Sequence, residues 1–127
     1  MAAVRPMAAT PDVRRVELPW PPSVNRLWRS VGGRTLLSRE GRRYRREVMA
    51  RLAAARARPM VGRLSVSLWL HPPDRRRRDI DNPQKALLDA MQDAGLFEDD
   101  SQIDERHTRR MAVVPGGCVI VEIAEQV

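Results

Sequence analysis

The chain has few of the residues and segments that characterise several common protein classes. It contains one cysteine, Cys118, which excludes an intrachain disulfide and a zinc site built from several cysteines. Aromatic residues make up only 4% of the sequence, which argues against a protein that stacks single-stranded bases on aromatic rings. No apolar run approaches the length of a membrane-spanning helix, so no membrane partner is expected. The single thiol fits a reducing compartment, and we predict a cytoplasmic location.

Basic residues are abundant, yet lysine is almost absent. Lys and Arg total 23 against 16 acidic residues, the formal net charge is +7, and Lys85 is the only lysine. This excess predicts a polyanionic partner, and nucleic acid is the first candidate. A chain that uses Arg for nearly every cation but keeps one Lys suggests that an ammonium group is needed at that position.

The length and the local composition predict one domain. A chain of 127 residues is within the usual size of a single domain. The first residues are rich in Ala, Pro and Thr, so we expect a flexible N-terminal arm over residues 1–12 and a single domain over residues 13–127.

Apolar periodicity predicts the secondary structure. Alternation predicts a short strand at 16–18, a clear strand at 64–70, a weaker strand at 105–114 and a last strand at 119–123, the final two joined as a hairpin. Helical spacing predicts one helix between Ser38 and Pro59. A second helix is predicted with Asn82 as its cap and Gly95 as its terminator. We therefore expect an α/β fold, a small mixed β-sheet of about four strands with two main helices packed on it.

Acidic residues flank the second predicted helix. Asp79 and Asp81 precede it, and Asp99 and Asp100 follow it. If residues 79–81 are extended, the first two carboxylates point to one side, and a helix that folds back would bring the second pair to them. Hard cations such as Mg²⁺ prefer these oxygen ligands, so the pattern suggests metal-assisted attack on a phosphodiester. The alternative is that Asp79 pairs with neighbouring arginines while Asp81 caps the helix.

Cations lie beside these acids. Lys85 falls in the first turn of the helix, where the helix dipole makes a cation slightly unfavourable, so a nearby phosphate or carboxylate cluster would explain it. The alternative is a solvated lysine that pairs with Asp81 or Asp89. The run formed by residues 75–78 is either a solvated face or a phosphate-binding segment.

Taken in order, these residues resemble the RusA family of Holliday-junction resolvases, small homodimeric endonucleases often carried by phages and prophages. The resemblance runs from about residue 16 to residue 123. It is carried by 18–23 with Asn25 and Arg26, by 33–35, by Ser38 with Glu40, Gly41 and Tyr44, by 73–82 with Lys85, and by 88–90, 94–95 and 99–100. Three features depart from the family pattern: an arm of about a dozen residues precedes the usual start, Pro83 replaces the more usual aliphatic residue, and the stretch 105–110 is unusually charged.

The resemblance implies a site and a substrate. It implies that Asp79, Asp81 and Asp100 bind the metal, that Asp99 supports them and that Lys85 assists catalysis. It also implies Mg²⁺, or Mn²⁺, as cofactor and a homodimer that makes paired symmetric nicks in branched DNA, a four-way junction. We expect the DNA contacts to come from Arg75, Arg76, Arg77, Arg78, Asn25 and Arg26.

We therefore expect a Mg²⁺-dependent crossover junction endodeoxyribonuclease. One alternative is a catalytically weak protein that binds branched DNA. The other is a phosphohydrolase that acts on small phosphate esters, although a small substrate does not need a surface charge of +7.

Overall fold

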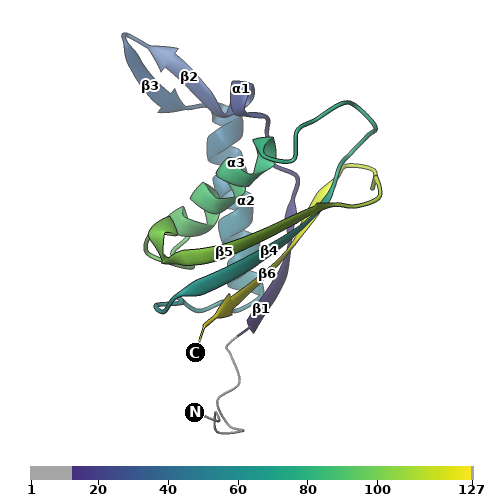
Figure 1. The fold of residues 1–127 in the computed structure, drawn as a ribbon. Coiled ribbons are helices and arrows are strands. Elements are labelled where there is room, and N and C mark those ends of the chain that lie inside the picture. Colours follow the sequence, from purple (N-terminus) through teal and green to yellow (C-terminus); the bar gives the residue numbers. More distant parts are fainter. Residues whose placement is uncertain (1–12, 127) are drawn as a thin grey trace, which may run out of the picture.

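The computed structural model describes residues 13–126, so the arm predicted over residues 1–12 lies outside the described residues. The fold is mixed α/β, as predicted, with a four-stranded sheet, two long helices packed on it and a separate two-stranded sheet (Figure 1). In chain order the elements are β1 (Val13–Pro19), α1 (Val24–Leu27), β2 (Trp28–Val31), β3 (Arg34–Leu37), α2 (Arg39–Ala54), β4 (Leu64–His71), α3 (Asn82–Asp93), the 3-10 helix η1 (Asp100–Gln102), β5 (Ile103–Arg110) and β6 (Cys118–Glu125).

The main sheet has the strand order β1-β6-β4-β5. Strand β4 is one of its two inner strands, antiparallel to β6 and parallel to β5. Its alternation is confirmed, because Leu64, Val66, Leu68 and Leu70 are all buried in the core shared with α2 and α3, while the residues between them are only half-buried. The helices therefore cover one face of the sheet, and the other face carries mainly polar side chains.

The predicted terminal hairpin is wrong. Strands β5 and β6 do not pair with each other, because β4 lies between them. The segment that joins them crosses the end of β4, where Met111 N donates to Leu70 O at 2.8 Å and Val114 N donates to Pro72 O at 3.0 Å. Alternation predicted both strands, but it carries no information on which strand lies beside which.

Both main helices begin where the sequence placed them, with one correction. Ser38 caps α2 as predicted, its Oγ accepting from Gly41 N at 3.0 Å, and the helix ends at Ala54, before Pro59. Asn82 is not the cap of α3. It is the first helical residue, and its Oδ1 accepts from Val24 N at 3.3 Å, which ties the start of α3 to α1. The predicted cap was wrong because a partner distant in sequence uses this amide.

Strands β2 and β3 form a hairpin that stands away from the main sheet (Figure 1). The sequence indicated only its turn, where Gly32 and Gly33 both have positive φ, as a tight two-residue hairpin turn requires.

None of the helices in residues 13–126 combines the length and the apolar character needed to cross a membrane.

Candidate functional site

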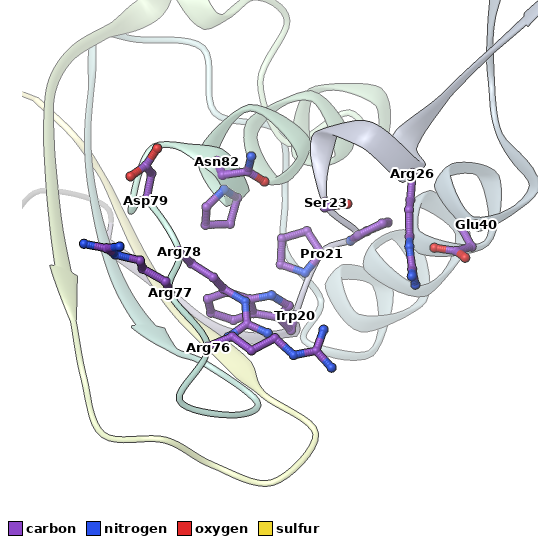
Figure 2. A pocket seen from close by; sticks show the side chains of 12 residues that line it. Trp20, Pro21, Ser23, Arg26, Glu40, Arg76, Arg77, Arg78, Asp79 and Asn82 are labelled. Carbon is purple, nitrogen blue, oxygen red and sulfur yellow. The ribbon is translucent and has the colours of Figure 1, made fainter.

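A groove of about 550 Å³ brings together two segments that are far apart in the sequence. We call it the Trp20 groove. Figure 2 shows its side chains, which come from the proline-rich segment after β1, from α1 and α2, from the loop between β4 and α3, and from the start of α3. Its lining consists of Trp20, Pro21, Pro22, Ser23, Arg26, Glu40, Arg76, Arg77, Arg78, Asp79, Asn82 and Pro83. Arg76, Arg77 and Arg78 of the arginine run therefore share a groove with Asp79, one of the predicted catalytic acids.

Arg78 holds the loop between β4 and α3 in place. Its guanidinium lies 5.9 Å from the centroid of the Trp20 ring, and its Nη1 donates to Asp74 Oδ1 at 2.7 Å. Asp74 also accepts from Arg76 N at 2.9 Å. The hydrogen bonds from Arg78 and from Arg76 N lower the pKa of Asp74 to about 2, so this carboxylate is ionised at neutral pH. The carbonyl of Arg78 accepts from Arg110 Nη2 at 2.6 Å, which joins the loop to the end of β5.

The other residues predicted to contact DNA make few contacts with the rest of the protein. Arg76 is highly exposed and lies 3.7 Å from Asp74 Oδ2. Within residues 13–126, the guanidinium groups of Arg26, Arg75 and Arg77 have no ion pair or hydrogen bond, and all three residues are exposed. Asn25 is also exposed, next to Arg26 in α1. These free guanidinium groups are suited to phosphate oxygens, which accept charge-assisted hydrogen bonds.

Asp79 and Asp81 lie at the start of α3 and both are exposed. The condition under which their carboxylates would share one side, an extended backbone over residues 79–81, is not met. They form a turn in which Asn82 N donates to Asp79 O at 3.4 Å, and Asp81 already has helical angles. The Asp81 carboxylate does not cap the helix, but accepts from Gln84 Nε2 at 3.4 Å. In the described residues, no ion pair joins Asp79 to an arginine, so its carboxylate is available to a ligand.

Asp99 and Asp100 lie beyond the other end of α3. The Asp99 carboxylate accepts from Ser101 N at 2.9 Å and caps η1, and this hydrogen bond is the main reason that the pKa of Asp99 is lowered. Asp100 lines a second groove of about 530 Å³ together with Leu88 and residues 103–106. Asp100 N donates to Gln92 Oε1 at 3.2 Å, which places Asp100 beside the last turns of α3.

Helix α3 therefore separates the two acidic pairs. At about 1.5 Å per residue, position 81 is about 16 Å along the helix axis from position 92, beside which Asp100 lies. No group of three or more His, Cys, Asp or Glu side chains is positioned to hold a metal ion within residues 13–126. The carboxylates are of the chemical type that Mg²⁺ and Mn²⁺ prefer, but one chain in this conformation does not gather three of them. The metal site stays a prediction.

Lys85 points along α3 toward an acid of its own helix. Its Nζ lies 3.3 Å from Asp89 Oδ1, one helical turn away, and its side chain is about two-thirds exposed. This is the surface pair that the sequence left open as the alternative. An exposed pair of this kind is weak, so it leaves the ammonium group free to move to a phosphate.

The sequence reasoning did not identify Asp74, Trp20 and Arg110 as parts of the site, and it assigned Arg78 to DNA contact and not to holding the loop. Asp74 and Arg78 are four positions apart, a spacing that predicts an ion pair in a helix. They lie in a loop, where the same spacing does not predict a contact. Trp20 lies under the guanidinium of Arg78, a position in which it helps to hold the loop. Arg110 gave no signal, because its contact with Arg78 depends on the parallel pairing of β4 and β5.

The chain matches the family described as endodeoxyribonuclease RusA over residues 19–124. It is 43% identical over 115 residues to the crossover junction endodeoxyribonuclease RusA of Escherichia coli strain K12, an alignment that covers 87% of this chain and 92% of the relative. It is 42% identical over 112 residues to the corresponding protein of Enterobacteria phage 82, with the same coverage. For the protein of Enterobacteria phage HK97 the identity is 38% over 109 residues, covering 85% and 91%.

Proposed function

The chain belongs to the endodeoxyribonuclease RusA family, and from this premise we propose that it resolves four-way DNA junctions by metal-dependent, paired and symmetric nicks. The observation that carries the proposal is the Trp20 groove, where Asp79, whose carboxylate has no ion pair within residues 13–126, lies beside an arginine-rich loop. A nuclease needs this combination, because phosphates must be held close to the groups that cleave them.

The arginines in and around the Trp20 groove have two different functions. Arg78 orders the loop through Trp20 and Asp74, so its contribution to DNA binding is indirect. Arg75, Arg77 and Arg26 are exposed and free of ion pairs among the described residues, and we assign the direct phosphate contacts to them. Their guanidinium groups neutralise phosphates without selecting a sequence, as binding to a branched structure requires.

We assign the catalytic acids as Asp79, Asp81 and Asp100, with Asp99 in support and Lys85 as the cation that offsets charge on the cleaved phosphate. A Mg²⁺ or Mn²⁺ ion bound by these acids would activate water and stabilise the leaving oxygen. Since α3 separates Asp79 and Asp81 from Asp100, a site that uses all three requires a conformational change or an acid from a second subunit. Asp79 and Asp81 are exposed and lie in the same turn, so they can approach DNA together.

We further propose that the active species is a homodimer. A four-way junction needs two nicks, and a two-fold dimer presents two equivalent sites to a substrate with two-fold symmetry. The cytoplasmic location expected from the single cysteine stays a prediction that fits this function.

A junction-cleavage assay tests the proposal. The substrate is a four-way junction labelled in turn on each strand, incubated with Mg²⁺, with Mn²⁺ or with EDTA, and the controls are the Asp79→Asn variant and a linear duplex of the same sequence. We expect symmetric nicks with either metal, none with EDTA and none by the variant. Binding without cleavage under every condition would instead identify a junction-binding protein. Hydrolysis of a small phosphate ester without junction cleavage would identify a phosphohydrolase.

A further inference from the structure

The hairpin formed by β2 and β3 projects from the end of the molecule that carries the Trp20 groove. Within residues 13–126 its two strands pair only with each other. Figure 1 shows the hairpin at the same end as the loop between β4 and α3, with α1 between them. Arg26, which lines the groove, belongs to α1 and comes two residues before the start of β2. The hairpin therefore extends the surface to which we assign the phosphate contacts.

The base of the hairpin is fixed on the start of α2. Ser38 N donates to Leu27 O at 2.8 Å, and Ser38 Oγ donates to Arg26 O at 2.5 Å. A β-carbon at Gly41 would lie 2.8 Å from Leu27 O and 2.9 Å from Leu37 Cδ1, so only glycine fits between the two ends of the hairpin. These contacts set the direction in which the hairpin projects relative to the groove.

One face of the hairpin is basic. Residues 28–37 include two arginines and no acidic residue. Arg29 is opposite Leu36, and Arg34 is opposite Val31, so these four side chains share one face. We call it the arginine face. All four residues are exposed, and in the described part of the chain neither guanidinium has an ion pair or a hydrogen bond. The arginine face therefore suits a polyanion.

The tip of the hairpin is uncovered, and its exposed apolar side chains have no partner in the fold. No described atom outside the neighbouring residues lies within 4 Å of the position that a β-carbon of Gly32 or Gly33 would take. Val31, beside this turn, and Leu36 are among the exposed large hydrophobic residues. Phosphates offer nothing to such side chains, whereas the faces of unstacked bases do.

We infer that the β2-β3 hairpin enters the branch point of a four-way junction, where Arg29 and Arg34 bind phosphates while Val31 and Leu36 contact unstacked bases. This inference rests on the junction substrate in the proposed function and adds the surface that recognises the branch. A two-stranded ribbon is narrow enough to enter a groove of DNA. In a continuous duplex, however, the stacked bases present only their edges. Stacking is interrupted where the strands exchange, so apolar side chains separate bases there at lower cost.

The charge of the hairpin selects DNA over a second copy of the chain. Each copy has a net charge of +7, so two copies repel each other unless acids face the arginines. The arginine face has no acid of its own to offer in return. An apolar patch alone would fit either partner, but covered guanidinium groups need acceptors, which phosphates supply in excess.

A first double variant tests the phosphate contacts. Arg29→Gln/Arg34→Gln should weaken junction binding and reduce the slope of log K against log salt by about 1.8, since each lost phosphate contact contributes about 0.9. The control Arg56→Gln/Arg58→Gln removes the same charge from exposed positions beyond the far end of α2, so it should leave the slope unchanged. Fluorescence anisotropy with a four-way junction measures binding, in EDTA so that no cleavage intervenes.

A second double variant tests the contact with bases. The junction carries 2-aminopurine at the branch point, whose fluorescence rises when the base loses its stacking, and wild-type protein should produce this rise. Val31→Ser/Leu36→Ser keeps both arginines, so it should still bind but should lose the rise and part of the preference for the junction over a linear duplex. The control Met49→Ser/Val61→Ser changes two exposed apolar residues elsewhere and should behave as the wild type. Circular dichroism checks that each variant folds.

The outcomes separate this inference from the proposed function. If the wild type prefers the junction and both hairpin variants match it in slope and fluorescence, the inference is wrong while the proposed function stands. A smaller slope with unchanged fluorescence would place the hairpin on a duplex arm and overturn its insertion at the branch point. A change of sedimenting mass in either hairpin variant would identify a contact between copies and also overturn the inference. If the wild type binds junction and duplex equally, the proposed function fails, and the inference fails with it.

Discussion

The guanidinium of Arg78 lies over the ring of Trp20, 5.9 Å from its centroid. The two residues are 58 positions apart in the chain, and both line the Trp20 groove. Their contact, with the ion pair from Arg78 to Asp74, fixes the path of the loop that carries Asp79. The arginine run is therefore not uniform, and its members should respond differently to substitution.

Replacing Arg75 and Arg77 together with Gln should weaken junction binding and make its salt dependence shallower. Each lost phosphate contact should reduce the slope of log K against log salt by about 0.9. Fluorescence anisotropy over a range of salt concentrations measures this slope. The matched comparison is Arg78→Gln, which should alter the loop and lower cleavage more than it changes the slope. An unchanged slope in the Arg75 and Arg77 variant would place this part of the loop away from DNA.

Replacing Asp79, Asp81 or Asp100 singly with Asn should lower cleavage by about 100-fold or more, because a bound metal contributes several kcal/mol to catalysis. Junction binding should survive, since the free arginines remain. The measurements are single-turnover cleavage and anisotropy on the same preparations. Asp93→Asn, an acid near the end of α3 that pairs with Arg45, is a control that should cut normally. Wild-type cleavage by any one of the three variants would remove that residue from the site.

Lys85→Ala should reduce the cleavage rate by about 100-fold, the usual effect of losing one group that stabilises transition-state charge, and should change affinity much less. Single-turnover rates at saturating protein separate the two effects. Asp89→Asn removes the partner of Lys85 without removing the ammonium group, so it should cut at close to the wild-type rate. If Lys85→Ala cuts normally once bound, Lys85 is only a phosphate contact.

Mixing wild-type and Asp81→Asn subunits should give dimers that nick one strand and leave the opposing strand intact. The reason is that each nick requires its own complete site, and a mixed dimer has only one. Junctions with each strand labelled separately report which strands are cut. A monomeric protein that makes both cuts would contradict the dimer.

Tyr44→Phe should lower the free energy of unfolding by about 1–2 kcal/mol, because it leaves the Pro19 carbonyl without its donor. Burial raises the pKa of Tyr44, so the hydroxyl keeps its proton and acts as a donor over the whole working pH range. Urea unfolding measures the change. Met49→Leu, an exposed substitution on the same helix, should have little effect. Equal stability of Tyr44→Phe and the wild type would show that water replaces the lost hydrogen bond.

Local patterns in the sequence determined much of this protein. The alternation from Leu64 to Leu70 identified the central strand, because a half-covered sheet buries every second residue. Ser38 marked the start of α2, because a side-chain oxygen at that position satisfies a free N–H of the first turn. The motifs around Asp79, Asp81 and Lys85 indicated the family, which the family match over residues 19–124 confirms.

Only the tertiary structure decided which of these elements meet. It placed β4 between β5 and β6 and set α3 between Asp81 and Asp100. It also directed the Asn82 side-chain oxygen to Val24 N, so that Asn82 does not cap its own helix. It also divided the arginines into Arg78, which holds the loop, and Arg75 and Arg77, whose guanidinium groups are free in the described residues. The physical reason is the same in each case. Periodicity and capping depend on residues within a few positions of each other, whereas strand order and long-range contacts depend on how the whole chain buries its apolar surface.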